Sequence, residues 1–504
     1  MQFVARWISA AIIGGLAVFS FTVMKADAFQ IDRVNGDDRY ETAVEISQKG
    51  WSNGSDVVVL TRGDEFPDAL AGSPLAHAKD APLLLTEKDH LTAITKKEIN
   101  RLNPSSIFIL GGPGAVSSKI EKTLKNTFSA EITRIAGNNR YQTAAKVAAQ
   151  LPGNDRAFVV NGSRFPDAMA AAPYAARHGH PILLTKSSYI PQSTQEALRG
   201  KKQTTIVGGD GVVSQSVEND LPNPERISGN TRYKTSAQAV LHLRMGRPDN
   251  AYVVTGNKFA DGIAGSVLAA KYNDPILLVE ENYVPNAIKI AVHKRGLEKF
   301  TVFGGYNAVD QYVDTELSLP IQLLLVNKAR GIPASYKDDH LVKPNVRFPS
   351  NSDLPKHYMS SIAAGHLENM FDDAWAAGKE LYAVSGYRSY ERQKEIHERI
   401  TRNHGSEYAD RVSAEPGHSE HQTGLAMDVS SPAVGYQLVE SFANTVEGRW
   451  LEQHASDYGF IIRYPDGRER DTGYTYEPWH LRYVGKSIAR YMDRTNKILE
   501  DYLR

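Results

Sequence analysis

The chain of 504 residues contains no cysteine. Disulfide bonds are therefore excluded, and so is any metal site that uses thiolate ligands. A metal ion held by this protein has to be bound by histidine and carboxylate side chains. This restriction directs the search for a catalytic centre toward clusters of His, Asp and Glu.

A net charge is also lacking, because 58 Lys and Arg residues balance 58 Asp and Glu residues. No global field attracts the protein to nucleic acid or to a membrane surface, and attraction to an anionic polymer must come from local patches. We therefore predict no nucleic-acid partner.

Two common functional motifs are missing. No GxGxxG sequence or P-loop lysine is present in the repeats described below, which disfavours nucleotide binding. The zinc-protease motif HExxH is absent too. His397-Glu398 has Thr401 where the second histidine would stand, so we interpret this pair as part of a solvated helix face.

Long apolar runs are confined to the first residues of the chain. Arg6 precedes an apolar stretch from Ile8 to Val23, and Ala26-Asp27-Ala28 offers an A-x-A cleavage site. This pattern predicts a secretory signal peptide over 1–28, cleaved before Phe29. An uncleaved anchor is the alternative, because the apolar stretch is somewhat long. The mature protein is expected to be secreted and to have no membrane association.

Two short stretches near the C-terminus supply the residues of a hydrolytic zinc site, SEHQTGLAMD at 419–428 and EPWH at 477–480. A catalytic zinc ion takes three protein ligands and keeps a position open for water. We assign His421, Asp428 and His480 as the ligands and Glu477 as the base. Zinc lowers the pKa of a bound water from ~16 to ~7, so a nearby carboxylate can accept its proton at neutral pH.

A third element lies upstream, SGYRS at 385–389 followed by Gln393. Arg388 comes after the apolar run Leu381–Val384, which predicts a short buried strand. An arginine at this point can bind a carboxylate through two charge-assisted hydrogen bonds of about 1.5–3 kcal/mol each. A purely structural ion pair is the alternative.

These motifs, with RYP at 463–465 and RYVG after EPWH, resemble the VanY-type D-alanyl-D-alanine carboxypeptidases. The resemblance covers about 321–504 and implies an α+β zinc peptidase domain of the lysostaphin, D-Ala-D-Ala peptidase and hedgehog type. It implies that Zn²⁺ is the cofactor and that Glu477 is the general base. The expected zinc ligands are His421, Asp428 and His480. The residues expected to contact the terminal D-residue of the substrate are Arg388, Gln393, Ser419 and Tyr464, with Arg388 also able to stabilise the oxyanion.

The activity implied is removal of the terminal D-Ala from peptidoglycan stem peptides. Two alternatives stay open at this point. L,D-carboxypeptidases that act on the tetrapeptide share these motifs, and the domain can also be a vestigial part of a wall adhesin or scaffold. The complete ligand set argues against the second alternative.

The rest of the chain contains a threefold repeat with a period of roughly 95 residues, the size of a small domain rather than of a solenoid unit. It begins with RVNGDDRYETA at 33–43, RIAGNNRYQTA at 134–144 and RISGNTRYKTS at 226–236. Apolar runs then alternate with helical stretches, and the last run of each copy ends in Gly-Gly. This alternation predicts small α/β domains with parallel sheets buried on both faces.

The repeats resemble the cell wall-binding repeat 2 family over about 31–318. The family implies three tandem copies packed around a pseudo-threefold axis. It also implies anchoring to anionic polymers of a Gram-positive wall, near the segments PLLLT at 82–86, PILLT at 181–185 and PILLV at 275–279. Arg39, Arg140 and Arg232 can contact phosphates or, as the alternative, form a structural salt bridge within each repeat.

We therefore predict a signal peptide at 1–28, wall-binding repeats at 29–125, 126–221 and 222–320, and a carboxypeptidase domain at 321–504. No low-complexity linker precedes the last domain. Restrained tethering of an enzyme to its polymeric substrate raises the effective substrate concentration without a new contact at the catalytic site.

Overall fold

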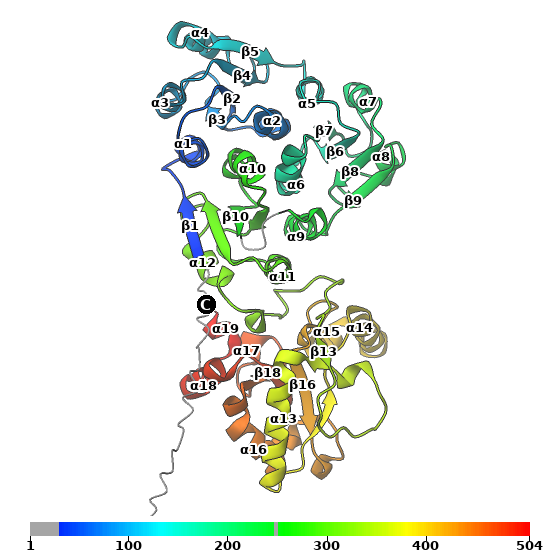
Figure 1. Cartoon of the computed structure of the whole chain (residues 1–504). Helices are drawn as coiled ribbons and strands as arrows, with labels where there is room; N and C mark the ends of the chain where they lie inside the picture. Colours follow the sequence, from blue (N-terminus) through cyan, green and yellow to red (C-terminus); the bar gives the residue numbers. More distant parts are fainter. Residues whose placement is uncertain (1–29, 246–249, 504) are drawn as a thin grey trace, which may run out of the picture.

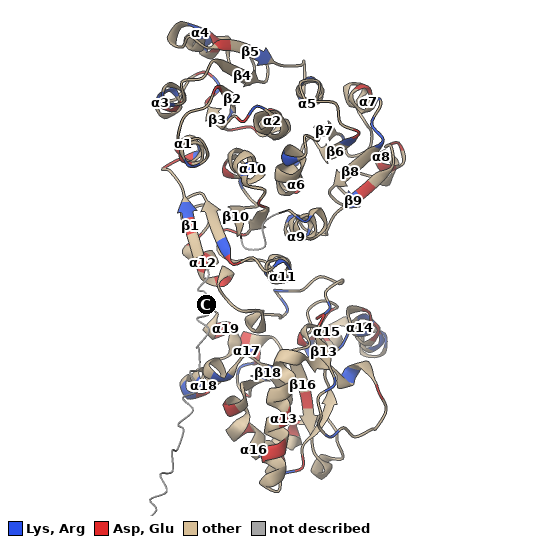
Figure 2. Cartoon of the chain, in the orientation of Figure 1, with Lys and Arg blue, Asp and Glu red and all other residues tan. Residues whose placement is uncertain are grey.

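The structure, a computed structural model, describes residues 30–245 and 250–503. The predicted signal peptide lies outside the described residues. The repeats form one part of the molecule, and the C-terminal domain forms a second part beside the third repeat (Figure 1). Charges of both signs are interspersed over both parts (Figure 2). Within the described residues, no helix combines the length and the apolar character needed to cross a bilayer.

Each repeat alternates four strands with four helices. The first contains β1 (Gln30–Val34), α1 (Arg39–Gly50), β2 (Val57–Arg62), α2 (Pro67–Ala78), β3 (Leu83–Thr86), α3 (Ala93–Leu102), β4 (Ser106–Leu110) and α4 (Ser118–Thr127). The second contains β5 (Glu131–Ile135), α5 (Arg140–Ala148), β6 (Arg156–Asn161), α6 (Pro166–Arg177), β7 (Ile182–Thr185), α7 (Gln192–Leu198), β8 (Gln203–Val207) and α8 (Gln215–Asn219). The third contains β9 (Pro224–Ile227), α9 (Arg232–Leu243), β10 (Asn250–Thr255), α10 (Ala260–Tyr272), β11 (Ile276–Val279), α11 (Asn286–Arg295), β12 (Lys299–Phe303) and α12 (Gln311–Leu317).

The three parallel sheets do not follow the repeats along the sequence. Their strand orders are β3-β2-β4-β5, β7-β6-β8-β9 and β11-β10-β12-β1. The fourth strand of each sheet is therefore the first strand of the next repeat, and β1 completes the sheet of the third repeat. Val34 pairs in parallel with Phe303, which closes the three repeats into a ring. The predicted parallel α/β units are confirmed, and the strand exchange between them is an additional feature.

Both faces of each sheet are covered, so its strands contain continuous apolar runs, including those of the edge strands β3, β7 and β11. All residues of β3, β7 and β11 are buried. The leucines of the PLLLT, PILLT and PILLV segments therefore belong to the core. Any polymer contact near these segments has to be made by the loops that follow the strands.

Helices α2, α6 and α10 pack on one another at the centre of the repeats (Figure 1). Their small residues permit this close approach, since a Cβ at Gly262 of α10 would clash with the side chain of Met169 on α6. At the start of the three helices, the rings of Phe66, Phe165 and Phe259 lie within 5.8 Å of one another, centroid to centroid. These contacts join all three repeats into one apolar core.

One set of arginines joins neighbouring repeats, and a second set bonds within each repeat. Arg33 on β1 donates to the carbonyls of Gly304 and Val309 and forms a two-pronged ion pair with Asp314 of the third repeat. The corresponding residues Arg134 and Arg226 make similar contacts with the preceding repeat.

The second set was expected to contact phosphates or an acid. Instead, Arg39, Arg140 and Arg232 donate to the glycine carbonyl after β2, β6 and β10, respectively. No ion pair involving these three arginines is present among the described residues. The expected salt bridge is therefore not found among the described residues, since each arginine bonds to a backbone oxygen that needs a donor. The phosphate contact stays a prediction.

The C-terminal domain has an α+β architecture around an antiparallel sheet with the order β15-β16-β18-β17. Its strands are β13 (Leu341–Val342), β14 (Met359–Ser360), β15 (Tyr382–Ser385), β16 (Ala426–Ser430), β17 (Phe460–Tyr464) and β18 (Glu477–Tyr483). Its helices are α13 (Ser361–Ala376), α14 (Tyr390–His404), α15 (Ser406–Val412), α16 (Val446–His454), α17 (Glu469–Thr472), α18 (Lys486–Thr495) and α19 (Leu499–Tyr502). Short 3₁₀ turns include Ile321–Leu323 and Glu420–Thr423. Apolar residues of α13 pack with the sheet in one core.

The connection between the two parts is bonded on both sides. Asn286, at the start of α11, donates to the carbonyl of Leu325 at 2.7 Å. Arg330 forms an ion pair with Glu316 of α12. On the other side, the backbone N–H of Ile332 donates to the carbonyl of Gly417. The segment before the enzyme domain is therefore attached to both parts.

Candidate metal centre and active site

The candidate metal ligands come together because of strand register and one tight turn. Asp428 on β16 lies opposite His480 on β18 in the antiparallel ladder. His421 lies in the turn before β16, which ends at Gly424 with a positive φ of 75°. A Cβ at Gly424 would lie 2.8 Å from the side chain of Leu341, so glycine meets both a conformational and a steric demand.

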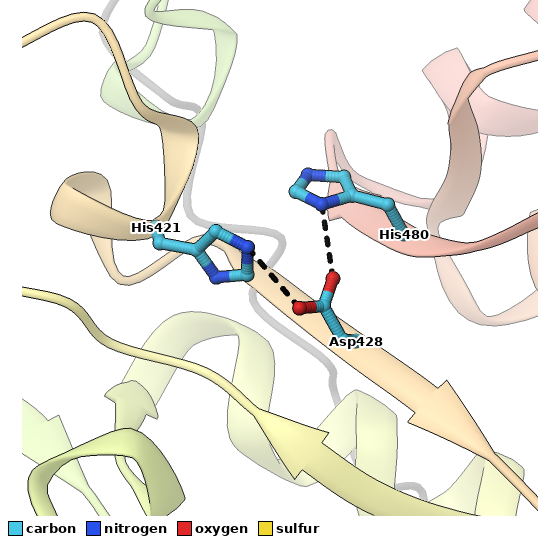
Figure 3. A group of neighbouring side chains, drawn as sticks. All are labelled: His421, Asp428 and His480. Carbon is cyan, nitrogen blue, oxygen red and sulfur yellow. Dashed lines mark ion pairs between the residues drawn. The ribbon is translucent and has the colours of Figure 1, made fainter. Parts of the chain in front are cut away.

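The three side chains converge on one buried point (Figure 3). His480 Nδ1 is 3.0 Å from Asp428 Oδ1, and His421 Nε2 is 3.4 Å from Asp428 Oδ2. One ligand atom from each residue lies within 4.8 Å of the other two. The donor set of two imidazoles and one carboxylate is of the type that binds catalytic zinc.

The environment of these atoms also fits a cation. Asp428 Oδ1 is buried and has no hydrogen-bond partner among the described residues. A buried carboxylate oxygen without a donor is costly unless an ion satisfies it. His421 Nδ1 lies 2.8 Å from the carbonyl of Gly386, so a proton on Nδ1 donates there and Nε2 remains free as a ligand.

The pKa values of the two imidazoles shift in opposite directions. Burial lowers the pKa of His421 to about 3. Burial also opposes the charged form of His480, but the carboxylates of Asp428, Glu420 and Glu477 outweigh it and raise the pKa of that ring to about 9. The carboxylates around His480 therefore favour a positive charge at this side of the site.

Glu477 begins β18 and pairs with Tyr464 at the end of β17. Its Oε2 is 3.7 Å from His480 Nδ1, and its side chain is 20% exposed. Burial, opposed by the nearby His480, raises the pKa of this carboxyl to about 7. A carboxylate with a pKa near neutrality can both accept and return a proton.

Arg388 lies beside the metal ligands, since its backbone N–H donates to the carbonyl of His421. Its Nη1 donates to Gln393 Oε1 at 2.9 Å, and the Gln393 amide donates in turn to Ser413 Oγ and to the carbonyl of Ala414. Gln393 is 1% exposed. The side-chain oxygen of Gln393 thus holds Arg388 and its amide is bonded to the protein, while the expected substrate contact stays a prediction.

The remaining predicted residues line a cavity of about 230 Å³. Ser419 and Tyr464 are both buried in its wall. The ring of Tyr464 lies 4.9 Å from that of His480, centroid to centroid. Arg388, the three candidate ligands and Glu477 line the same cavity. One pocket thus contains the candidate metal ligands, the candidate base Glu477 and the guanidinium of Arg388.

Sequence reasoning missed much of the cavity wall. Four apolar residues and Tyr474 contribute to it, the apolar ones being Ile396, Ile400, Val412 and Leu438. Ile396 and Ile400 are one helical turn apart on α14, and this spacing was the available signal. Trp479, next to His480 in the sequence, also lines the cavity.

A second cavity, of about 520 Å³, lies where the third repeat meets the first. Polar residues from both repeats line it, among them Asn35, Arg39, Asn257, Lys258 and Asn307. Tyr306 at its edge is 60% exposed and lies under the guanidinium of Arg33. This cavity exists only because β1 closes the ring.

Comparison with known proteins identifies both parts of the chain. The family described as cell wall binding domain 2 matches residues 33–121, 134–218 and 226–314, together more than half of the chain. The family described as D-alanyl-D-alanine carboxypeptidase (VanY) matches residues 356–486. The chain belongs to the cell wall binding domain 2 family and carries a VanY domain. Both resemblances stated from the sequence are confirmed.

Relatives of this cell wall binding domain 2 protein match one part or the other. The N-acetylmuramoyl-L-alanine amidase LytC of Bacillus subtilis is 37% identical over 61% of this chain and 61% of its own length. A second Bacillus subtilis protein, named "Putative carboxypeptidase YodJ", is 48% identical over 36% of this chain and 66% of its own length. The chain spans less than two thirds of the length of either relative.

A solved structure shares the architecture of the repeats. Cwp8 from Clostridium difficile superimposes with a TM-score of 0.54 and 30% sequence identity, over 57% of this chain and 51% of that protein.

Proposed function

We propose that this protein is a secreted, wall-anchored zinc D,D-carboxypeptidase that removes the terminal D-Ala from peptidoglycan stem peptides. The observation that carries this proposal is the convergence of His421, Asp428 and His480 beside Glu477 in one cavity. The VanY match and the wall-binding repeats support the substrate class.

His421 Nε2, His480 Nδ1 and a carboxylate oxygen of Asp428 would hold the ion. The chemistry that such an ion supplies is polarisation of the scissile carbonyl and acidification of a water molecule. Glu477 is placed to accept the proton of that water and to return it to the leaving amine. Arg388, held by Gln393, binds the terminal carboxylate through its guanidinium.

The aromatic and apolar residues of the cavity wall surround the candidate metal ligands. The rings of Tyr464 and Tyr474 lie 4.9 Å apart, centroid to centroid, and are tilted by 50° to one another, with Tyr464 next to His480. The apolar residues of α14 and Leu438 form further parts of the wall. Partial burial of Arg388 strengthens its attraction to a carboxylate, because the local dielectric constant is lower than in water.

The test is incubation of the protein with defined stem peptides, with the products read by mass. Loss of one alanine from the pentapeptide, abolished by a chelator and restored by zinc, is the expected result. Loss of D-Ala from the tetrapeptide alone would instead assign L,D specificity. No release from either peptide by a zinc-loaded protein would favour a wall adhesin.

For the repeats we propose non-covalent anchoring to an anionic wall polymer after export by the predicted signal peptide. The cavity between the third and first repeats is not a basic site, because Asp37, Asp38 and Asp261 line it together with Arg39 and Lys258. Binding should be measured on purified walls before and after acid extraction of anionic polymers. Equal binding to extracted walls would refute the anionic ligand.

A further inference from the structure

A cluster of four buried charged residues lies behind His480, on the side away from Asp428. Arg463 and Arg482 are both 0% exposed, Glu420 is 1% exposed and Glu500 of α19 is 6% exposed. Two positive and two negative charges balance one another, as a buried cluster requires. The catalytic scheme above uses none of these four groups.

The two arginines share a single oxygen of Glu420. Arg463 Nε donates to Glu420 Oε1 at 2.8 Å, and Arg482 Nη1 donates to the same oxygen at 2.6 Å. Arg463 also forms a two-pronged bond with Glu500, at 2.9 and 2.6 Å. These bonds fix the Glu420 carboxylate and leave its second oxygen unused.

That second oxygen points at the metal ligand. Glu420 Oε2 lies 3.6 Å from His480 Nε2. Both atoms are buried, and neither has a hydrogen-bond partner among the described residues. The separation is slightly longer than a hydrogen bond, and no other group competes for either atom. A ring nitrogen and a carboxylate oxygen that are both buried, face each other and have no other partner among the described residues are placed to form a hydrogen bond after a small shift.

We propose that Glu420 is the positioning residue of His480. The Glu420 carboxylate accepts the proton of Nε2, so the neutral ring carries its hydrogen there and presents the Nδ1 lone pair toward Asp428. Metal-binding histidines commonly use their second nitrogen in this way, and the acceptor orients the ring. This inference rests on the proposed metal site.

The cluster reaches the third repeat through the connecting segment. Arg482 Nη2 donates to the carbonyls of Gln322 and Leu324, at 2.9 and 2.8 Å. Asn327 donates to Glu500 at 3.2 Å. The orientation of His480 is thus supported by segments on either side of the matched VanY region, which spans 356–486.

Two substitutions of Glu420 separate positioning from charge balance. Glu420→Asp keeps the negative charge opposite both arginines but withdraws the carboxylate from His480 by one methylene. Glu420→Gln keeps the length of the side chain and removes its charge. Glu500→Gln disturbs Arg463 equally but does not touch His480, so it is the matched control.

The measurement is zinc affinity of the full chain, by competition with a chromogenic chelator, with folding checked by circular dichroism. We expect the Kd for zinc to rise about 10- to 100-fold in Glu420→Asp and Glu420→Gln. The visible spectrum of the cobalt-substituted protein should change in both. Glu500→Gln should leave affinity and spectrum close to wild type. In a His480→Ala background, Glu420→Asp should no longer affect metal affinity.

A folded Glu420→Asp variant with wild-type zinc affinity and cobalt spectrum would overturn the proposal. If Glu420→Gln does not fold, the result for Glu420→Asp alone is sufficient for this test. A wild-type protein that binds no zinc would instead refute the metal site itself. The two failures are therefore distinguishable.

Discussion

Glu477 Oε2 lies 3.7 Å from His480 Nδ1, on the open side of the candidate metal cluster. The two residues are separated by Pro478 and Trp479 and both belong to β18. A base and a metal ligand on one strand have a fixed separation, and this rigidity keeps the carboxylate at the same place relative to the substrate.

The first prediction concerns Glu477→Gln. The amide cannot accept a proton, so we expect kcat to fall by about 10²- to 10⁴-fold while zinc content stays at the wild-type level. D-Ala release from the pentapeptide and metal analysis of the same sample test both statements. Glu398→Gln, on the exposed face of α14, is the control and should be fully active. An active Glu477→Gln enzyme with full zinc content would refute the assigned role.

The second prediction separates two roles of Arg388. If its guanidinium binds the terminal carboxylate, Arg388→Lys should weaken kcat/KM for the acid peptide by about 10- to 100-fold, equivalent to one charge-assisted bond. A peptide ending in D-alaninamide should be affected much less. The ratio of the two kcat/KM values is the measurement. Equal losses for acid and amide would indicate oxyanion stabilisation instead.

The third prediction concerns metal removal. Ligand binding stabilises a fold by about 2.7 kcal/mol at a concentration 100 times the Kd, so zinc-loaded protein should unfold at a higher temperature than protein treated with a chelator. His421→Ala should abolish most of this difference together with activity. His404→Ala, an exposed histidine on α14, should change neither. Calorimetry with and without added zinc is the direct measurement.

The convergence of the candidate metal ligands was predictable because they stand in short motifs. His421 and Asp428 are seven positions apart, and a turn followed by a strand brings them together without any distant contact. The strands of the repeats were predictable for a similar local reason, since continuous apolar runs indicate sheets covered on both faces.

Long-range partners could not be read from the sequence. The pairing of Val34 with Phe303 joins residues from opposite ends of the repeat array, and no local pattern distinguishes it from pairing within one repeat. The partners of Gln393 could not be predicted for the same reason, because Ser413 and Ala414 belong to a later segment. Glu420 also depends on a distant partner, the α19 residue Glu500 that holds Arg463.

The fourth prediction tests the closure of the ring. Arg33→Ala removes an ion pair with Asp314 and two bonds to carbonyls of the third repeat. Bonds to charged groups contribute about 1.5–3 kcal/mol each, so we expect destabilisation of at least that size. Hydrogen exchange should increase in β1 and β12 before it does elsewhere in the repeats. Arg199→Ala, an exposed arginine, should leave exchange unchanged.

The fifth prediction concerns the pH dependence of stability in the second repeat. His180 stacks on Phe158 and His178, at 5.9 and 5.8 Å between ring centroids. Burial lowers the pKa of His180 to about 4, and the neighbouring His178, Arg156 and Lys201 act in the same direction. In the unfolded chain the pKa of a histidine is about 6.5. Between these values the unfolded state binds more protons than the folded state, so stability should decrease as the pH falls from about 6.5 to about 4.

The substitution His180→Gln removes this titration. Its urea midpoint should therefore change less between about pH 7 and about pH 5 than the wild-type midpoint does, because only the other titrating groups remain. His90→Gln, at an exposed position of the first repeat, is the control and should keep the wild-type pH dependence. If His180→Gln and wild type lose the same stability on acidification, the neutral buried state of His180 is not what the fold requires.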